Sequence, residues 1–414
     1  MRKSVAMLLV LVFLLVSLAA TTKRAEAQYS GTVTIKADGS IDPATAPIST
    51  NDNVTYTLTD DIQCIKLRRF NTVLDGSGHT IQGNGTGSGI EIANPSDATI
   101  SEGYNVTVKN FNVKGFETGI NVFGYWGNII RGVVIAGNNV TNNYNGIVFS
   151  SYYLYSNNTI TGNSITANNQ GIIIQMSDGG GNESGNSITE NQIADNQVGM
   201  RFTWMISYWG RVPTSIIEMN NQMYHNNFIN NSQNVFNTQL YSLHGYCYAI
   251  EYSNVWDNGS VGNFWSAYNG TDADGDGVGE TPYVIDDNNQ DNYPRMASID
   301  FAEPSILVLS PENKTYDEAS IPLIFTVNED VAQITYSLDG EETVIISGNT
   351  TLNGLRNGNH NVTVYAMDEA GNTGTSKTNY FSVNVPFPTI LVTTTAIVAV
   401  IGVGLLLYFK KRKH

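Results

Sequence analysis

The sequence is poor in two residue types that support disulfide frameworks, soft-metal sites and acid–base chemistry. Its 414 residues include 2 cysteines and 5 histidines. A disulfide framework of the kind that holds small secreted domains needs more cysteines than this. Cys64 and Cys247 are far apart in the sequence. In the repeat architecture argued below they fall several coils apart, so we expect no bridge between them.

Positive charge is also scarce. The chain has 21 Lys and Arg against 37 Asp and Glu, a formal net charge of −16. An acidic excess of this size argues against nucleic acid as a partner, because a phosphate backbone attracts basic surfaces. It suits a surface that is solvated or that recruits cations.

Apolar runs occur at the two ends of the chain. Arg2 and Lys3 precede an apolar stretch and an A-x-A site ending at Ala27, which predicts a signal peptide over residues 1–27. Residues 388–409 are uncharged and mostly apolar, long enough to cross a hydrocarbon core of ~30 Å as a transmembrane helix. Residues 410–414 then form a basic cytoplasmic tail. These features predict a single-pass cell-membrane protein with its bulk outside, and N-x-[ST] sequons such as Asn139 are compatible with glycosylation.

A repeat of asparagine, glycine and apolar residues decides the fold class. The template is N-x-h-x-x-N-x-x-G-h-x-h, with h apolar, and the copies recur every 25 to 35 residues. This spacing, with very short period-2 strands, predicts an all-β solenoid. Asn and Gly are expected at turns because both tolerate positive φ, and stacked Asn side chains should hydrogen-bond from coil to coil. The copies are anchored at Gly89, Gly119, Gly146, Gly171, Gly199 and Asn234.

Period-2 alternation assigns a direction to the residues after each anchor. Ile120, Ile147, Ile172 and Met200 follow their anchors directly, so we expect them to stack inside the solenoid. The next residue of each copy should face outward. This outward row is Glu91, Asn121, Val148, Ile173 and Arg201, with one acidic member.

Three sequence features together resemble a known family. They are "LDGSGHTIQG" from Leu74 to Gly83, the asparagine repeats, and the closing "GNFWSAYNGTDADGDGVGETPYVID" followed by "DNYP". They resemble the NosD-like periplasmic copper-binding proteins over about Gln28 to Ile299. The resemblance implies a right-handed parallel β-helix with a C-terminal cap, here over residues 28–303. It does not settle an activity, because one fold hosts many functions.

Residues 304–385 have a different pattern. Stretches such as "IPLIFTV" and "HNVTVYAMDEAGN" alternate apolar and polar residues between turn signals, which predicts a small Ig-like β-sandwich. It resembles the immunoglobulin-like modules of archaeal surface proteins. We expect it to act as a spacer between solenoid and membrane.

Aromatic residues provide the main candidate for binding. Stretches rich in Tyr and Trp follow the anchors at similar offsets, so a solenoid should bring them to one side. Flat rings suit sugar faces, although the same rings could instead pack on each other as a small second core. The predicted platform consists of Tyr125, Trp126, Tyr152, Tyr153, Tyr155, Trp204, Tyr208 and Trp209.

An enzyme is the first alternative. Glycoside hydrolysis needs two carboxylates facing one sugar, roughly 5–9.5 Å apart, and the outward row contains only Glu91. The acidic pairs Asp60-Asp61 and Asp286-Asp287 lie outside the central coils. We therefore expect a non-enzymatic cell-surface protein that binds glycans or other cell-envelope components, or that serves in structural display. A polysaccharide lyase or hydrolase remains the alternative.

The sequence contains candidate ligands for two metals, calcium and copper. Asp272, Asp274 and Asp276 resemble the start of an EF-hand loop, which predicts structural Ca²⁺ held with the Val278 carbonyl and Glu280. The bidentate Glu of that loop is absent, since its position is Tyr283, so an ion-free acidic turn stays open.

Copper handling is the further alternative, because it is what the family resemblance implies. Copper(I) favours clustered Met, Cys and His. The candidates are a single loose group whose methionines could equally fill gaps in the core, so we do not expect copper. They are Met219, Met223, His225, His244 and Cys247.

Overall fold

The computed structural model describes residues 29–93, 103–124, 129–151, 154–177, 185–205, 217–243, 246–386, 401–403 and 405–411. The chain divides into two compact units, Met1–Ile299 and Asp300–His414. Residues 401–403 and 405–411 are helical. Within these described ranges no helix is both long and apolar enough to cross a membrane. The predicted signal peptide and most of the predicted transmembrane segment lie outside them.

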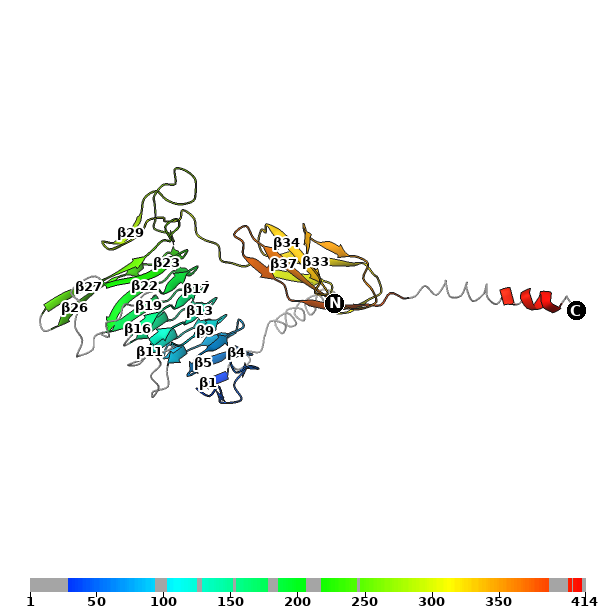
Figure 1. The fold of residues 1–414 in the computed structure, drawn as a ribbon, viewed down its shortest axis with the longest axis horizontal. Coiled ribbons are helices and arrows are strands. Elements are labelled where there is room, and N and C mark those ends of the chain that lie inside the picture. The colour runs from blue at the N-terminus through cyan, green and yellow to red at the C-terminus, as the bar shows by residue number, and fades with distance from the viewer. Residues whose placement is uncertain are drawn as a thin grey trace, which may run out of the picture. The chain divides into compact units, whose positions relative to one another are not determined.

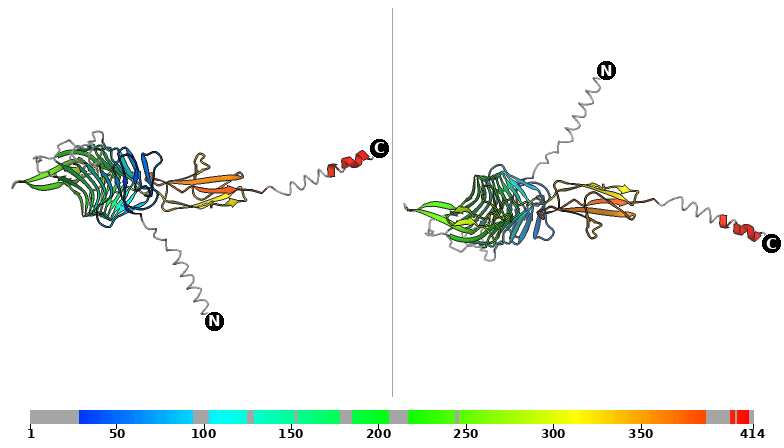
Figure 2. Two further views of the ribbon diagram at one scale, coloured as in Figure 1. Left: turned by 90° about the horizontal axis from the view of Figure 1, so that it is seen from below. Right: turned by 90° about the horizontal axis from the view of Figure 1, so that it is seen from above.

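The first unit consists of the long parallel sheets of a β-helix (Figure 1). One coil is formed by β13 (Val134–Ala136), β14 (Asn139–Thr141) and β15 (Asn145–Ser151), which lie on three different faces. The strands of the next coil pair with these in the same order. Successive coils therefore stack strand on strand, as the two views of Figure 2 also show.

The strands of each face are hydrogen-bonded in parallel. The first face, with β15, contains β5 (Ile62–Leu67), β8 (Ser88–Ala93), β11 (Thr118–Gly124), β19 (Gln170–Ser177), β22 (Val198–Met205) and β25 (Gln233–Phe236). The second, with β14, contains β7 (Thr80–Gln82), β10 (Asn112–Lys114), β18 (Ser164–Thr166), β21 (Gln192–Ala194), β24 (Asn227–Ile229) and β28 (Phe264–Trp265). The third, with β13, contains β4 (Thr55–Leu58), β6 (Thr72–Asp75), β9 (Val106–Lys109), β17 (Thr159–Thr161), β20 (Ser187–Thr189), β23 (Ile217–Tyr224) and β27 (Tyr246–Val255).

The remaining strands lie at the ends and edges of the stack. At the N-terminal end, β1 (Tyr29–Ile35) pairs in parallel with β5, and two antiparallel pairs join β1 to β2 (Ile41–Asp42) and β4 to β3 (Ile48–Ser49). Elsewhere β12 (Ile129–Arg131) pairs with β16 (Leu154–Ser156), β26 (Thr238–Leu243) with β27, and β29 (Tyr283–Asp286) with β30 (Asn289–Asp291).

The interior is a stack of apolar side chains in register. Ile120 pairs with Ile147, Ile147 with Ile172, and Ile172 with Met200, and all four are completely buried. The sequence prediction for these four positions is confirmed. Cys64 lies in β5 as a free thiol, also as expected.

Buried asparagines link one coil to the next. Each of Asn138, Asn163, Asn191 and Asn226 donates both its backbone N–H and its Nδ2–H to the Oδ1 of the equivalent asparagine one coil on, at 2.9–3.1 Å. The last of these acceptors is Asn263. The expected ladder of asparagine side chains is therefore confirmed. Two further ladders run through Asn143, Asn168, Asn196 and Asn231, and through Asn158, Asn186, Asn221 and Asn254.

The reason given for glycine and asparagine at the repeat positions was wrong. The residue with positive φ is the one before most of the ladder asparagines, such as Asn142 at 56° or His225 at 57°. The anchor glycines lie in extended strands, and a Cβ on Gly119 would come within 2.7 Å of the Gly146 carbonyl oxygen in the next coil. Glycine is required there because the coils approach closely.

The first ladder ends on a carboxylate. Asp291 is completely buried, and its Oδ2 accepts the Asn263 N–H at 2.7 Å and the Trp265 Nε1–H at 2.8 Å. A carboxylate only accepts, so it can terminate a chain of donors without adding another. Burial raises the pKa of the Asp291 carboxyl, opposed by these hydrogen bonds.

Stacked aromatic rings cover the C-terminal end of the core. The ring of Trp265 lies between Phe228 and Tyr283, with centroids 4.3 Å apart on both sides and interplanar angles of 9° and 14°. These rings take the place of the apolar row that a further coil would supply.

The second unit contains a small β-sandwich. One sheet has three strands, β31 (Ile306–Ser310), β33 (Ile321–Val327) and β36 (Thr350–Leu352). The other contains β32 (Thr315–Tyr316), β34 (Gln333–Leu338), β35 (Val344–Ile346), β37 (Gly358–Met367), β38 (Thr373–Thr375) and β39 (Asn379–Val383). Inward residues such as Leu323, Val364 and Phe381 form a core separate from that of the β-helix.

Neighbouring asparagines allow a matched test of the ladder. Asn138 is buried and its side chain accepts the Phe111 N–H, whereas Asn139 is exposed. Because several buried partners lose their hydrogen bonds, Asn138→Ala should lower the free energy of unfolding by about 3 kcal/mol. Asn139→Ala should change it by about 0.5 kcal/mol or less. Equal effects of the two substitutions in denaturant titrations would contradict the ladder's role.

A pH series tests the buried end of the ladder. The folded-state pKa of Asp291 is raised, so its contribution to stability is complete below the unfolded pKa of ~3.9 and is lost as the pH rises through the folded pKa. Asp291→Asn removes this loss. The melting temperature of the variant relative to wild type should therefore rise between pH 4 and 7. A difference in melting temperature that stays constant over this pH range would argue against a raised pKa of Asp291. Asp287→Asn removes an exposed acid of the same region and controls for the change in charge.

Candidate binding groove

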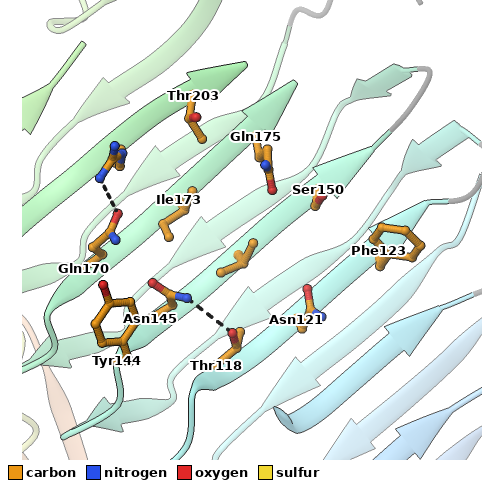
Figure 3. A pocket seen from close by; sticks show the side chains of 12 residues that line it. Thr118, Asn121, Phe123, Tyr144, Asn145, Ser150, Gln170, Ile173, Gln175 and Thr203 are labelled. Atoms are coloured by element: carbon orange, nitrogen blue, oxygen red, sulfur yellow. Dashed lines mark hydrogen bonds between the residues drawn. The ribbon is translucent and has the colours of Figure 1, made fainter. Parts of the chain in front are cut away.

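A groove of about 460 Å³ lies on the outward side of the first face (Figure 3). It crosses the neighbouring strands β11, β15, β19 and β22, a width of about 14 Å at ~4.8 Å per strand. Its volume is within the usual range of ligand sites. It is lined by Thr118, Asn121, Phe123, Tyr144, Asn145, Val148, Ser150, Gln170, Ile173, Gln175, Arg201 and Thr203.

The floor of the groove is built from three rows of outward side chains. Because Ile120 and its equivalents point inward, the next residue on each strand points outward, and the parallel register aligns these residues across the strands. The central row is Asn121, Val148, Ile173 and Arg201; the flanking rows are Thr118, Asn145 and Gln170, and Phe123, Ser150, Gln175 and Thr203.

The lining is polar and contains an exposed ring. Tyr144 is 57% exposed and lies beside Asn145 and Gln170, while Phe123 lies on the other side of the groove (Figure 3). Four of the lining side chains are amides and three are hydroxyls of Ser or Thr. Amides and hydroxyls both donate and accept hydrogen bonds, so the groove matches a ligand that carries many hydroxyl groups.

Neighbouring side chains hold part of this lining in position. The Arg201 Nη1–H donates to Gln170 Oε1 at 3.3 Å, shown as a dashed line in Figure 3, and its guanidinium carbon lies 4.7 Å from the centre of the Phe236 ring. The Asn145 Nδ2–H lies 3.5 Å from Thr118 Oγ1. A site whose polar groups are fixed beforehand loses less side-chain entropy on binding.

The acidic member of the outward row lies beyond the groove. Glu91 is in β8, opposite Asn121 of β11, and forms an ion pair with Arg68. None of the twelve described lining residues is a carboxylate. The described lining therefore does not contain the pair of acids that glycoside hydrolysis uses.

The predicted aromatic platform falls mostly outside the described residues. That is so for Tyr125, Trp126, Tyr152, Tyr153, Tyr208 and Trp209. The backbone of Tyr155 pairs with Ile130 and that of Trp204 with Met176, but the side chains of both predicted residues lie outside the description. β11 ends at Gly124 and β15 at Ser151, directly before Tyr125 and Tyr152.

The predicted calcium loop brings its aspartates together. One side-chain oxygen from each of Asp272, Asp274 and Asp276 lies within 4.8 Å of the other two. Asp272 also accepts the N–H groups of Gly275 and Gly277, at 2.7 and 2.9 Å.

Glu280 and the backbone of Val278, the source of the predicted carbonyl ligand, lie in the same loop. Glu280 accepts the Ala273 N–H, which is the main cause of the lowered pKa of its carboxyl. The Val278 N–H donates to Asp276 at 2.8 Å.

Two other groups in the described chain also bring possible metal ligands within 4.8 Å of one another. In the first, Asp60 and Asp61 lie near His79, whose Nδ1 is 3.4 Å from an Asp61 oxygen that also accepts the Thr80 N–H. The second group lies in the sandwich unit and consists of Asp300, Glu329 and Asp368. Exposed acidic clusters are common without an ion, so these remain structural observations.

The described residues do not fit the copper cluster considered from the sequence. Met223 is completely buried in the core, and His225 is a turn residue whose burial lowers the pKa of its imidazole. Met219 lies in β23 and Cys247 in β27, but the structure does not describe these two side chains, and His244 is outside the described ranges.

Sequence reasoning found one row of this groove but not the groove itself. Asn121, Val148, Ile173 and Arg201 were assigned outward and are so. Tyr144 and the flanking rows were missed. Alternation along the strand predicts an outward position for Gln175, two residues after Ile173, but not for Gln170, which is three residues before it. Only the pairing of the strands shows that Gln170 lines the groove.

Comparison with known proteins gives two findings. The family model described as "Periplasmic copper-binding protein (NosD)" matches residues 25–270. Among solved structures, the fibronectin(III)-like modules of CbhA from Clostridium thermocellum are 16% identical, over 20% of this chain and 95% of that chain, at a TM-score of 0.16. No curated protein matches the chain.

Proposed function

The chain belongs to the NosD family, and from this premise we propose that it is a non-enzymatic protein that binds glycans of the cell envelope. The groove across β11, β15, β19 and β22 is the observation that supports this most directly. Amides and hydroxyls there match sugar hydroxyls, and the ring of Tyr144 offers the apolar surface on which sugar faces stack.

The aromatic platform extends this proposal. Its members Tyr125 and Tyr152 come directly after the ends of β11 and β15, two strands that form the groove. A glycan chain longer than the groove would continue from the strand surface toward these residues. Ligands of this kind gain affinity from several weak contacts made along one chain.

The proposed location is the outer side of a cell membrane. The family's description as periplasmic supports export, in agreement with the signal peptide expected over residues 1–27. On this proposal the solenoid is a right-handed β-helix, since parallel crossover connections are nearly always right-handed. The sandwich is its stalk, and residues 388–409 anchor it.

The two alternatives have less support. A hydrolase needs paired carboxylates, and the twelve described groove residues include none. Copper handling rests on the family's description, but Met223, one of the three residues required for that cluster, is a core residue.

The loop from Asp272 to Glu280 is proposed to hold calcium in a structural role. Three carboxylates this close repel one another unless a cation lies between them. Oxygen ligands from carboxylates and a carbonyl are those that Ca²⁺ favours. The ion would stabilise the end of the β-helix that carries the buried Asp291.

A matched pair of tyrosines tests glycan binding. Tyr144 in the groove and Tyr380 in the sandwich are exposed by 57% and 62%. The full-length chain should retain oligosaccharides on a glycan array, and Tyr144→Ala should weaken this by about tenfold through loss of ring stacking. Tyr380→Ala should bind as wild type, and neither change should lower the melting temperature much. Equal binding by the two variants, or no retained glycan, would count against the proposal.

Thermal melting tests the calcium proposal. An ion that binds only the folded state stabilises it by about 2.7 kcal/mol at a hundredfold excess over its dissociation constant. Calcium should raise the melting temperature, a chelator should reverse this, and Asp274→Asn should abolish most of the effect. Asp287→Asn, outside the cluster, should respond as wild type. An unchanged midpoint with calcium would leave the ion-free acidic turn as the explanation.

A further inference from the structure

Arg201 gives the groove its charge. Among the twelve described lining residues it is the one with a formal charge, although the chain as a whole carries −16. A cation among twelve described lining residues that include no carboxylate favours anions locally on an otherwise acidic protein. An uncharged ligand would not need this.

The described groups that hold the guanidinium are uncharged. The Gln170 amide accepts one of its N–H groups, and the Phe236 ring lies against it. Within the described part of the chain no carboxylate lies within ion-pair distance of Arg201, whereas Arg68 on the same face is paired with Glu91. Arginine has five N–H donors, so most of its capacity remains for a ligand.

A planar guanidinium has a specific chemical partner. Its fork of parallel N–H groups matches a carboxylate, which it binds through two hydrogen bonds. Charge-assisted bonds of this type are roughly twice as strong as neutral ones. The contacts with Gln170 and Phe236 fix the plane of the fork, so less side-chain entropy is lost when an anion binds.

Resting on the glycan-binding function proposed above, we propose that the ligand is an acidic saccharide, and that Arg201 binds a carboxylate on one of its sugar units. The amides and hydroxyls of the neighbouring rows then bind the hydroxyl groups of the flanking sugars. The site recognises a uronate-bearing oligosaccharide in preference to its neutral counterpart. Gln170 acts as a positioning residue for the guanidinium.

The experiment uses the full-length chain on an array of neutral, sulfated and uronate-bearing oligosaccharides. The strongest uronate-bearing binder is then compared with the same oligosaccharide after reduction of its carboxylate to an alcohol. Wild type should prefer the carboxylate form by about tenfold or more, as the loss of a charge-assisted hydrogen bond implies. This preference should shrink as salt is added, because screening weakens exposed charges.

Substitutions assign the preference to one residue. Arg201→Gln should abolish it, leaving the reduced oligosaccharide bound as before, and Arg201→Lys should retain only part of it because an ammonium lacks the planar fork. Lys66→Gln is the matched control. Lys66 is exposed on β5 and lies opposite Glu91, so it belongs to the same outward row, but it is not one of the described groove residues. Its replacement should leave the preference intact.

The outcomes separate this inference from the function on which it rests. Three results would overturn the carboxylate assignment while glycan binding stands. Wild type could bind both forms equally, or it could retain only neutral or sulfated oligosaccharides. The third is an unchanged preference in Arg201→Gln. An equal loss for both forms in Arg201→Gln would show that the arginine only supports the fold of the groove. Failure of every oligosaccharide to bind would remove both proposals.

Discussion

The hydrogen bond from one buried asparagine to the next is the contact on which the rest of the β-helix depends. Each ladder asparagine uses its amide to bind its equivalent in the adjacent coil, as Asn163 does with Asn191. This satisfies backbone and side-chain groups that no water can reach, where an unpaired group is costly. It also fixes the register, because a coil shifted by one residue would present the wrong side chain to the ladder.

A ladder of this kind has a direction and therefore needs an end. Each asparagine of the first ladder donates its backbone N–H and an Nδ2–H to the coil on its C-terminal side. The last coil must therefore offer an acceptor that has no donor of its own to satisfy. The Asp291 carboxylate does so within the closing segment, next to the stacked rings of Trp265 and Tyr283. The same segment thus closes the polar ladder and the apolar core together, which explains why its sequence differs from that of the repeats.

Register also creates the groove. Once the coils are aligned from within, the outward residues are aligned as well, so side chains from separate coils form continuous rows over four strands. A solenoid surface of this type is well suited to an extended ligand, which meets similar groups at regular steps. In this chain the rows combine amides, hydroxyls and an exposed ring with Arg201, whose charge opposes that of the protein as a whole.

The sequence by itself determined the class of fold and the direction of its side chains. The period of the asparagines, and the alternation after each anchor, were enough to place Ile147 inside and Ile173 outside, because strand geometry allows two directions only. The tertiary structure decided the role of individual residues. It showed that Gly119 is needed for close approach of the coils rather than for a turn, and that Met223 belongs to the core. It also brought Tyr144 and Arg201, 57 residues apart in the sequence, to one groove. A sequence gives each coil its own pattern, but only the pairing of coils determines which residues are neighbours.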